Sequence, residues 1–173
     1  MIWRQLLVPW KFHLGQLHHV IQAAFGWWDY HLHQFLIGGL RDGDLEQIGE
    51  PEFEGDSRGF DETEIRLVDF GRRDPIKFGY EYDFGDGWEH MVEFERWLTL
   101  EPKPRVATRI DGAPARPPED VGGVHGYLGF LEILADPRHP EHADTKRWAC
   151  GHYDPDWFDV KMTDRDVRER IAK

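Results

Sequence analysis

The sequence predicts one α+β domain in which a mixed, mostly antiparallel sheet is followed by a helical C-terminal third. Three observations support this fold class. Aromatic residues alternate with polar ones on both sides of a Gly-Asp-Gly turn, which predicts a β-hairpin. Apolar residues recur at helical spacing after residue 14 and again after residue 126. A length of 173 residues with 40% hydrophobic residues suits a single core, so residues 1–173 are expected to form one domain.

The N-terminal part is expected to run strand, helix, strand, loop, strand. Residues 3–8 are a β-favouring run that a proline ends, and apolar residues at 14, 17, 21, 24 and 25 predict a helix that Gly26 terminates. Residues 30–37 and 65–67 return to extended patterns. Between them, residues 41–62 are expected to form a long, mobile, acidic loop, because Gly, Pro and like charges oppose ordering.

The net charge of -12 is concentrated around this loop. Residues 42–69 contain eleven carboxylates and two arginines, which gives -9, so the rest of the chain carries only about -3. The segment is therefore interpreted as a solvated surface, with an acidic docking segment for a basic partner as the alternative.

The aromatic hairpin is predicted to lie at the centre of the sheet. A three-residue turn of Gly85, Asp86 and Gly87, with Gly87 at positive φ, places the apolar residues of both strands on one face. The predicted cross-strand pairs are Phe84 with Trp88, Tyr82 with His90, Tyr80 with Val92 and Phe78 with Phe94.

The same register places Asp83 opposite Glu89 on the other face of the hairpin. Like charges in facing positions destabilise a strand pair. Either water screens the two carboxylates, or a positive group such as a divalent cation, a helix N-terminus or an arginine lies beside them.

The C-terminal part is predicted to be mostly helical. Residues 101–118 form a connector without periodicity, and residues 127–134 form a helix that ends at Asp136 before a proline. Pro140 suits the first turn of a helix that continues to about Ala149. Thr163 and Asp166 approximate a capping box for a final helix.

Histidines and carboxylates supply the candidate functional residues. His31 and His33 are two apart on a predicted strand, so they point to one face, a spacing that a metal site can use. The alternative is that both extend an aromatic face, while His18 is expected to be a hydrogen-bonded core histidine. The candidate metal ligands are His33, Asp83, Asp86 and His90, and the wider binding set is His31, His33, Asp83, Asp86, Trp88, His90, Glu119 and Asp120.

Nucleophilic catalysis has little support in the sequence. Ser57 is the only serine and lies in the acidic segment, where a nucleophile could hardly be held in place. Cys150 follows a predicted helix C-terminus, where the helix dipole disfavours a thiolate.

Composition restricts the partners and the compartment. A net charge of -12 opposes nucleic-acid binding unless basic side chains gather on one face. No apolar run is long enough for a membrane span, and one cysteine allows no internal disulfide, so we expect a cytoplasmic protein without a membrane partner. The basic candidates are Arg72, Arg73, Lys103, Arg105, Arg109 and Arg116.

Several motifs together resemble the family typified by the third open reading frame of the Ri plasmid pRiA. The resemblance covers nearly the whole chain in order, and the aromatic hairpin and the Pro-Pro-Glu-Asp segment are its most specific parts. The matching segments are Ile2 to Arg4 with Val8 and Pro9, Leu17 to Trp27, Tyr30 to Phe35, Tyr80 to His90, Pro117 to Gly123 with Gly126 and Tyr127, Leu131 to Pro137, His139 to His142 and Asp154 to Asp159.

The resemblance implies a β-grasp-like N-terminal part and bacterial relatives, some carried by plasmids and insertion elements, but it implies no particular reaction. Some relatives are labelled transposon resolvases; a serine recombinase is not expected here because Ser57 is the only serine. Relatives usually have a strand before the segment that starts at Ile2, and often have cysteines where this chain has Arg109, Arg116 and Val121. A thiolate metal site therefore does not carry over.

The leading functional hypothesis is a non-catalytic binding or interaction domain, associated with a mobile element, for a protein or small ligand. The first alternative is an enzyme in which a His/Asp/Glu cluster binds a divalent cation and activates water. The second is a nucleic-acid accessory factor, which requires the basic candidates to form one face.

Overall fold

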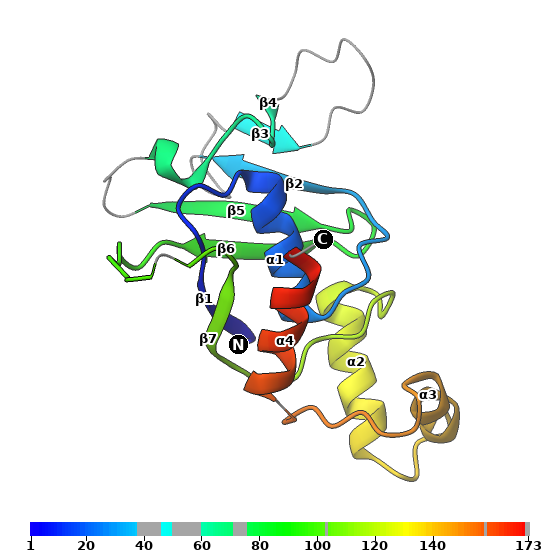
Figure 1. Ribbon diagram of the computed structural model, residues 1–173. Helices are drawn as coiled ribbons and strands as arrows, with labels where there is room; N and C mark the ends of the chain where they lie inside the picture. Colours follow the sequence, from blue (N-terminus) through cyan, green and yellow to red (C-terminus); the bar gives the residue numbers. More distant parts are fainter. Residues whose placement is uncertain (38–45, 50–59, 71–75, 103, 158, 172–173) are drawn as a thin grey trace.

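The computed structural model describes residues 1–37, 46–49, 60–70, 76–102, 104–157 and 159–171, which form two β-sheets and four α-helices (Figure 1). The strand pairs are antiparallel except for the parallel pair β3–β4. A five-stranded sheet has the order β4-β3-β2-β5-β6, and β1 pairs with β7 in a separate ribbon. The predicted α+β class is confirmed. The strands are β1 (Trp3–Leu7), β2 (His33–Ile37), β3 (Glu46–Gly49), β4 (Phe60–Asp61), β5 (Lys77–Tyr82), β6 (Trp88–Glu93) and β7 (Thr108–Ala113).

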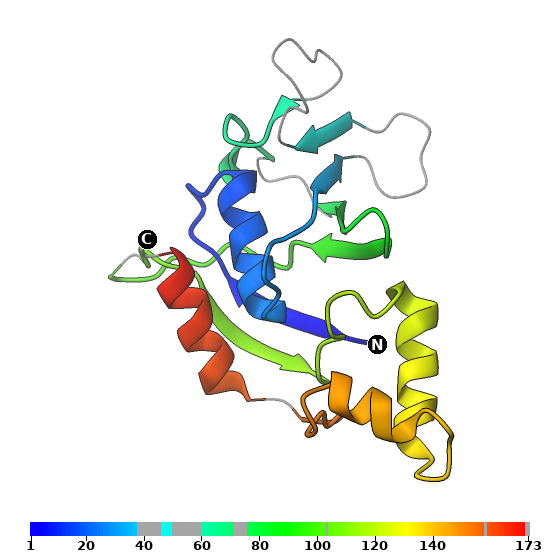
Figure 2. The ribbon, with the colours of Figure 1, turned by 90° about the vertical axis from the view of Figure 1, so that its right-hand side faces the viewer.

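Helix α1 (Leu14–Phe25) is the centre of the core. It begins at a capping box formed by His13 and Gln16 and ends at Gly26, as the sequence predicts. One side of α1 packs on the five-stranded sheet, where Leu14, Leu17 and Ile21 meet the aromatic residues of β2 and β5. Its other side meets α4 (Val160–Ile171), which in turn packs on β7 (Figure 2). Because both sides are covered, every residue of α1 except Gln16 and His19 is buried.

The helical C-terminal part agrees with the sequence prediction. Helix α2 (Gly123–Ala135) ends at Asp136, and α3 (His142–Trp148) follows Pro140. Helix α4 begins earlier than the predicted capping box at Thr163, because the Asp159 carboxylate accepts hydrogen bonds from the N–H groups of Lys161 and Met162. None of the described helices is both long and apolar enough to cross a membrane.

The predicted hairpin register is wrong by two residues. Tyr82 pairs with Trp88 and Tyr80 with His90, so the turn comprises the five residues 83–87. A shift of two preserves the face of every side chain, which is why the aromatic residues still enter the core. Consequently Glu81, not Asp83, lies opposite Glu89, and β6 is at the edge of the sheet while β2 is at its centre.

Three further expectations about secondary structure are corrected. Strands β3 and β4 fall within the predicted loop 41–62, and residues 38–45 and 50–59 lie outside the described part of the chain, as does Ser57. Residues 65–67 do not form a strand but lead into the 3-10 helix η1 (Leu67–Phe70). Strand β7 lies within the predicted connector 101–118 and owes its conformation to pairing with β1.

Candidate functional site

Three segments that are distant in sequence meet beside the five-stranded sheet. They are residues 28–33, which lead into β2; residues 83–87, which turn from β5 to β6; and residues 119–123, which lead into α2. We call them together the three-segment junction. The Asp83 N–H donates to the Leu32 carbonyl oxygen at 2.9 Å, and the Gly122 N–H donates to the Asp86 carboxylate at 3.0 Å.

The β5–β6 turn is organised by Asp83. Asp83 is 7% exposed and has a left-handed backbone conformation, with φ of 55°. One carboxylate oxygen, Oδ1, accepts hydrogen bonds from the N–H groups of Gly85 and Asp86 at 3.1 and 3.3 Å. The turn closes at Gly87, which has the predicted positive φ. The second oxygen of Asp83 is directed toward His31, at 3.6 Å from its Nε2 atom.

Tyr82 connects the other two segments of the junction. Its buried hydroxyl donates to Glu119 at 2.7 Å and accepts from the Tyr30 N–H at 3.2 Å. Burial, and then the neighbouring Glu119 carboxylate, raise the pKa of Tyr82, so the hydroxyl stays protonated and able to donate. Glu119 also accepts a hydrogen bond from the Trp28 N–H at 2.9 Å. The backbone at residues 28 and 30 is therefore fixed by side chains from β5 and the 119–123 turn.

The side chains of Trp28 and Tyr30 extend outward from this fixed backbone. They are 65% and 74% exposed, and their rings lie nearly parallel, with centroids 6.3 Å apart. Leu32 and Phe84, in the same junction, are 60% and 46% exposed. From sequence periodicity alone, a segment so rich in aromatic residues would be expected to lie in the core.

A buried polar network lies behind the junction and holds β5 against α1. Gln22 donates to the Tyr80 hydroxyl at 3.0 Å, and that hydroxyl lies 2.8 Å from His18 Nδ1. His18 Nε2 lies 2.7 Å from Asp29, and because a carboxylate only accepts, Nε2 carries the proton and Nδ1 accepts from Tyr80. Burial lowers the pKa of His18 despite its hydrogen bond to Asp29. The prediction of a hydrogen-bonded core histidine is confirmed.

His33 belongs to this network and not to the junction surface. Its ring stacks on His18 with centroids 3.5 Å apart, and its Nε2 lies 2.8 Å from the Glu62 carboxylate. Glu62 is 5% exposed, although the sequence places it at the end of a mobile loop. Sequence reasoning missed Glu62, and it also missed Asp29 and Gln22, because no periodic pattern marks a polar residue whose partner comes from another element.

His90 and Trp88 have structural roles. The Nδ1–H of His90 donates to the carbonyl oxygens of Tyr80 and Trp88 at 3.3 and 3.2 Å. Although part of His90 reaches solvent, its ring packs on Phe25 and Trp27, and burial lowers its pKa to about 4. Trp88 is buried against Trp27.

The predicted metal set of His33, Asp83, Asp86 and His90 is not assembled. Asp86 bonds to Gly122, and the two histidines face separate parts of the core. In the described part of the chain, two other sets of three ligand atoms lie within 4.8 Å of one another, and Asp83 is the one residue of the predicted set that they include. The groups are His18 with His19 and Asp29, and His31 with Asp83 and Asp120.

The described basic candidates do not form the face that nucleic-acid binding requires. The Arg116 guanidinium is partly buried and donates to the Gly26 carbonyl oxygen. Arg105 is exposed on the connector before β7. The side chains of the other four candidates, Arg72, Arg73, Lys103 and Arg109, lie outside the described residues.

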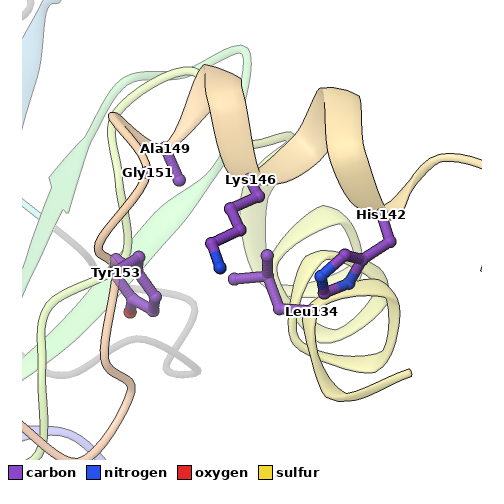
Figure 3. Close-up of a pocket in the computed structure, with 6 residues that line it drawn as sticks. All are labelled: Leu134, His142, Lys146, Ala149, Gly151 and Tyr153. Carbon is purple, nitrogen blue, oxygen red and sulfur yellow. The ribbon is translucent and has the colours of Figure 1, made fainter. Parts of the chain in front are cut away.

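A small pocket lies apart from the junction, between α2 and α3 (Figure 3). The Lys146 side chain extends into it between Leu134 and Tyr153. The Tyr153 hydroxyl is engaged with Tyr127 and the Arg116 carbonyl oxygen, both at 2.8 Å. None of the sequence-predicted site residues lines this pocket. The junction, which contains six of them, is the better candidate site.

Comparison with known proteins supports the resemblance seen in the sequence. A family model described as plasmid pRiA4b ORF-3-like protein matches residues 1–162. The uncharacterized protein y4hQ of Sinorhizobium fredii (strain NBRC 101917 / NGR234) is 39% identical over 161 residues, which cover 90% of this chain and 77% of y4hQ. The crystal structure of MM3350, a protein of unknown function from Methanosarcina mazei Go1, is similar with a TM-score of 0.74 and 35% identity, covering 92% of this chain and 88% of that one.

Proposed function

The chain belongs to the plasmid pRiA4b ORF-3-like family, and because its relatives y4hQ and MM3350 are themselves described as uncharacterised or of unknown function, we propose a function from the three-segment junction. The proposal is a non-catalytic binding domain that takes a cationic, arginine- or lysine-containing segment of a partner protein. The paired, exposed rings of Trp28 and Tyr30 on a fixed backbone carry this proposal.

Aromatic residues on a fixed backbone favour binding because the cost of ordering that backbone is met by folding and not by association. The amides of Trp28 and Tyr30 are already bonded to Glu119 and Tyr82, so little backbone freedom remains to be lost on binding. Exposed single hydrophobic residues are common, but aromatic anchors that project together are typical of interface hot spots.

The charge of the junction selects a cationic partner. Its three segments contain five carboxylates and no lysine or arginine, namely Asp29, Asp83, Asp86, Glu119 and Asp120. A guanidinium or ammonium group next to such carboxylates gains electrostatic attraction, and over the face of Trp28 or Tyr30 it gains a cation–π interaction. The same charge repels phosphate backbones, which weighs against the nucleic-acid alternative.

Binding is favoured over catalysis because every junction carboxylate except that of Asp120 is engaged in structural hydrogen bonds. Glu119 bonds to Tyr82 and Trp28, and Asp86 bonds to Gly122. A general acid or base must instead direct its oxygen at a substrate. A cytoplasmic location suits this proposal, since a chain with one cysteine needs no oxidising compartment.

Fluorescence anisotropy with a labelled hexapeptide of alternating arginine and glycine tests the proposal. We expect saturable binding that weakens as salt is added, because exposed charges are screened. The double variant Trp28→Ala/Tyr30→Ala should bind at least about tenfold more weakly, as expected for the loss of aromatic anchors. Its fold should persist because the hydrogen bonds at residues 28 and 30 come from the backbone.

Trp157→Ala is the matched control, since Trp157 is 51% exposed and precedes α4 on another part of the chain. It should bind the peptide like the wild type. Equal binding of the peptide by the double variant would contradict the proposal, as would equal binding of a glutamate–glycine hexapeptide. Stronger binding of a single-stranded oligonucleotide would favour the nucleic-acid alternative, and equally tight binding of free argininamide would indicate a small-ligand site.

A further inference from the structure

Three metal-ligating atoms meet at the centre of the junction. His31 Nε2 lies 3.6 Å from Asp83 Oδ2 and 3.2 Å from Asp120 Oδ1. One ligand atom from each of the three residues lies within 4.8 Å of the other two. The residues come from three different segments, so their proximity is a product of the fold and not of local sequence.

The imidazole nitrogen at this point has no hydrogen-bond partner. His31 Nε2 is buried from solvent and has no hydrogen bond. Asp83 Oδ2, at 3.6 Å, is too distant for one, and Asp120 Oδ1, at 3.2 Å, is not aligned to accept one. A buried ring nitrogen without a partner is costly, and such exceptions in native proteins call for an explanation. An ion bound between the three groups would satisfy the nitrogen through its lone pair.

The spacing of the three atoms fits a common ion. Metal–ligand bonds of about 2.1 Å that meet at tetrahedral or octahedral angles separate neighbouring ligand atoms by about 3.0 to 3.4 Å. The separations of 3.2 and 3.6 Å are close to this range. We propose that His31, Asp83 and Asp120 bind one divalent transition-metal ion, such as Zn²⁺ or Mn²⁺.

The donor set favours a transition metal over Ca²⁺ or Mg²⁺. Ca²⁺ takes six to eight oxygen ligands, and Mg²⁺ prefers oxygen in octahedral geometry. An imidazole combined with carboxylates suits Zn²⁺, Mn²⁺ and similar ions. Three protein ligands leave at least one coordination position for water or for a group of the partner.

The other cluster of ligand atoms, at His18, His19 and Asp29, is a weaker candidate. Both ring nitrogens of His18 already have partners in Tyr80 and Asp29. Asp29 lies 2.7 Å from His18 and 3.4 Å from His19, as in a hydrogen-bonded pair of histidines around one carboxylate. His31 is different because its buried nitrogen has no partner.

Isothermal titration of chelator-treated protein with ZnCl₂, MnCl₂, CaCl₂ and MgCl₂ tests this site. We expect one tight Zn²⁺ or Mn²⁺ ion per chain and weaker binding of the two alkaline-earth ions. Asp120→Asn should weaken binding at least about tenfold, because even residues behind a metal's direct ligands are worth that much. Asparagine tolerates the left-handed backbone of residue 120, with φ of 57°, so the turn is retained.

Asp83→Asn is a second ligand variant, since its amide oxygen can still accept the turn hydrogen bonds from Gly85 and Asp86. His19→Ala and Asp144→Asn are controls, because they remove a ligand atom from the other cluster and an exposed carboxylate from α3. Both controls should bind like the wild type. The proposal is overturned if no tight ion binds, or if Asp120→Asn binds as the wild type does.

Metal binding and peptide binding share a surface but can fail separately. Anisotropy with the arginine–glycine peptide is therefore repeated with chelator and with saturating Zn²⁺. Peptide binding without any tight metal site would refute the metal inference and leave the proposed function standing. Tight metal binding that depends on Asp120, without peptide binding in either condition, would refute the proposed function and leave the metal inference standing.

Discussion

Contact between two turns of the junction can be measured through a set of glycine substitutions. Gly123, the first residue of α2, has a left-handed backbone with φ of 66°, and a Cβ atom added to it would overlap the Asp86 carbonyl oxygen. Gly87 has the same backbone conformation, with φ of 64°, but nothing lies within 4 Å of an added Cβ. Gly129 in α2 has neither feature. The three positions therefore separate backbone strain from steric overlap.

The expected changes in unfolding free energy follow from these environments. Gly87→Ala should cost about 1 to 2 kcal/mol, the cost of a left-handed backbone for an L-residue. Gly123→Ala should cost about 3 to 5 kcal/mol, because overlap also separates the turns and breaks the Gly122–Asp86 hydrogen bond, worth about 1.5 to 3 kcal/mol for a charged acceptor. Gly129→Ala should stabilise the protein by up to about 1 kcal/mol through helix propensity.

Guanidinium unfolding followed by tryptophan fluorescence gives these free energies by linear extrapolation. The order Gly129→Ala, Gly87→Ala, Gly123→Ala from most to least stable is expected. If Gly123→Ala costs no more than Gly87→Ala, the α2 entry and the β5–β6 turn do not touch, and the reasoning that joins two segments of the junction is refuted.

Three other substitutions or conditions have defined outcomes. The pKa of His90 falls from 6.5 to about 4 on folding, so the unfolded chain takes up a proton before the folded chain does as pH falls. About 3 kcal/mol of unfolding free energy should therefore be lost between pH 6.5 and 4. Unfolding of His90→Gln measured across this pH range should show a smaller loss. Tyr82→Phe leaves one oxygen of Glu119 without its donor, and unfolding should show a cost of about 1 to 3 kcal/mol; an unchanged midpoint would contradict the hydrogen bond. In Gly15→Ala the added Cβ would overlap the Glu62 carboxylate and break the hydrogen bond between Glu62 and His33. This loss, partly offset by the higher helix propensity of alanine, should lower the free energy of chemical unfolding by about 1 kcal/mol. A stabilised variant would show that Glu62 moves freely.

Elements defined by periodicity were predictable from the sequence, whereas elements defined by pairing were not. The pattern from Leu14 to Phe25 gave α1 its correct limits because both an apolar period and a terminal glycine were present. Strand β7 contains Asp111 and Gly112 and has no alternation, so only its pairing with β1 makes it a strand. The hairpin register failed because the side chain of Asp83 caps a five-residue turn, which strand periodicity does not encode.

The candidate site could be predicted as a list of residues but not as a set of neighbours. His31, Asp83 and Asp120 were all expected to be functional, yet the predicted metal set joined Asp83 to His33 and His90. On an ideal strand His31 and His33 would share a face, but residue 31 precedes β2, which begins at His33. His33 therefore turns to Glu62, while His31 turns to the carboxylates of two loops.

Assembly of the junction from residues 28–33, 83–87 and 119–123 has a consequence for how the protein loses its site. Each closing contact spans tens of residues, so its entropic cost is recovered only when the core between α1 and the sheet is complete. No fragment that lacks one of the three segments retains the surface. The fluorescence signal of a ligand bound at Trp28 would therefore be lost in the same transition as the global fold. It would measure the fraction of fully folded molecules in a mixture.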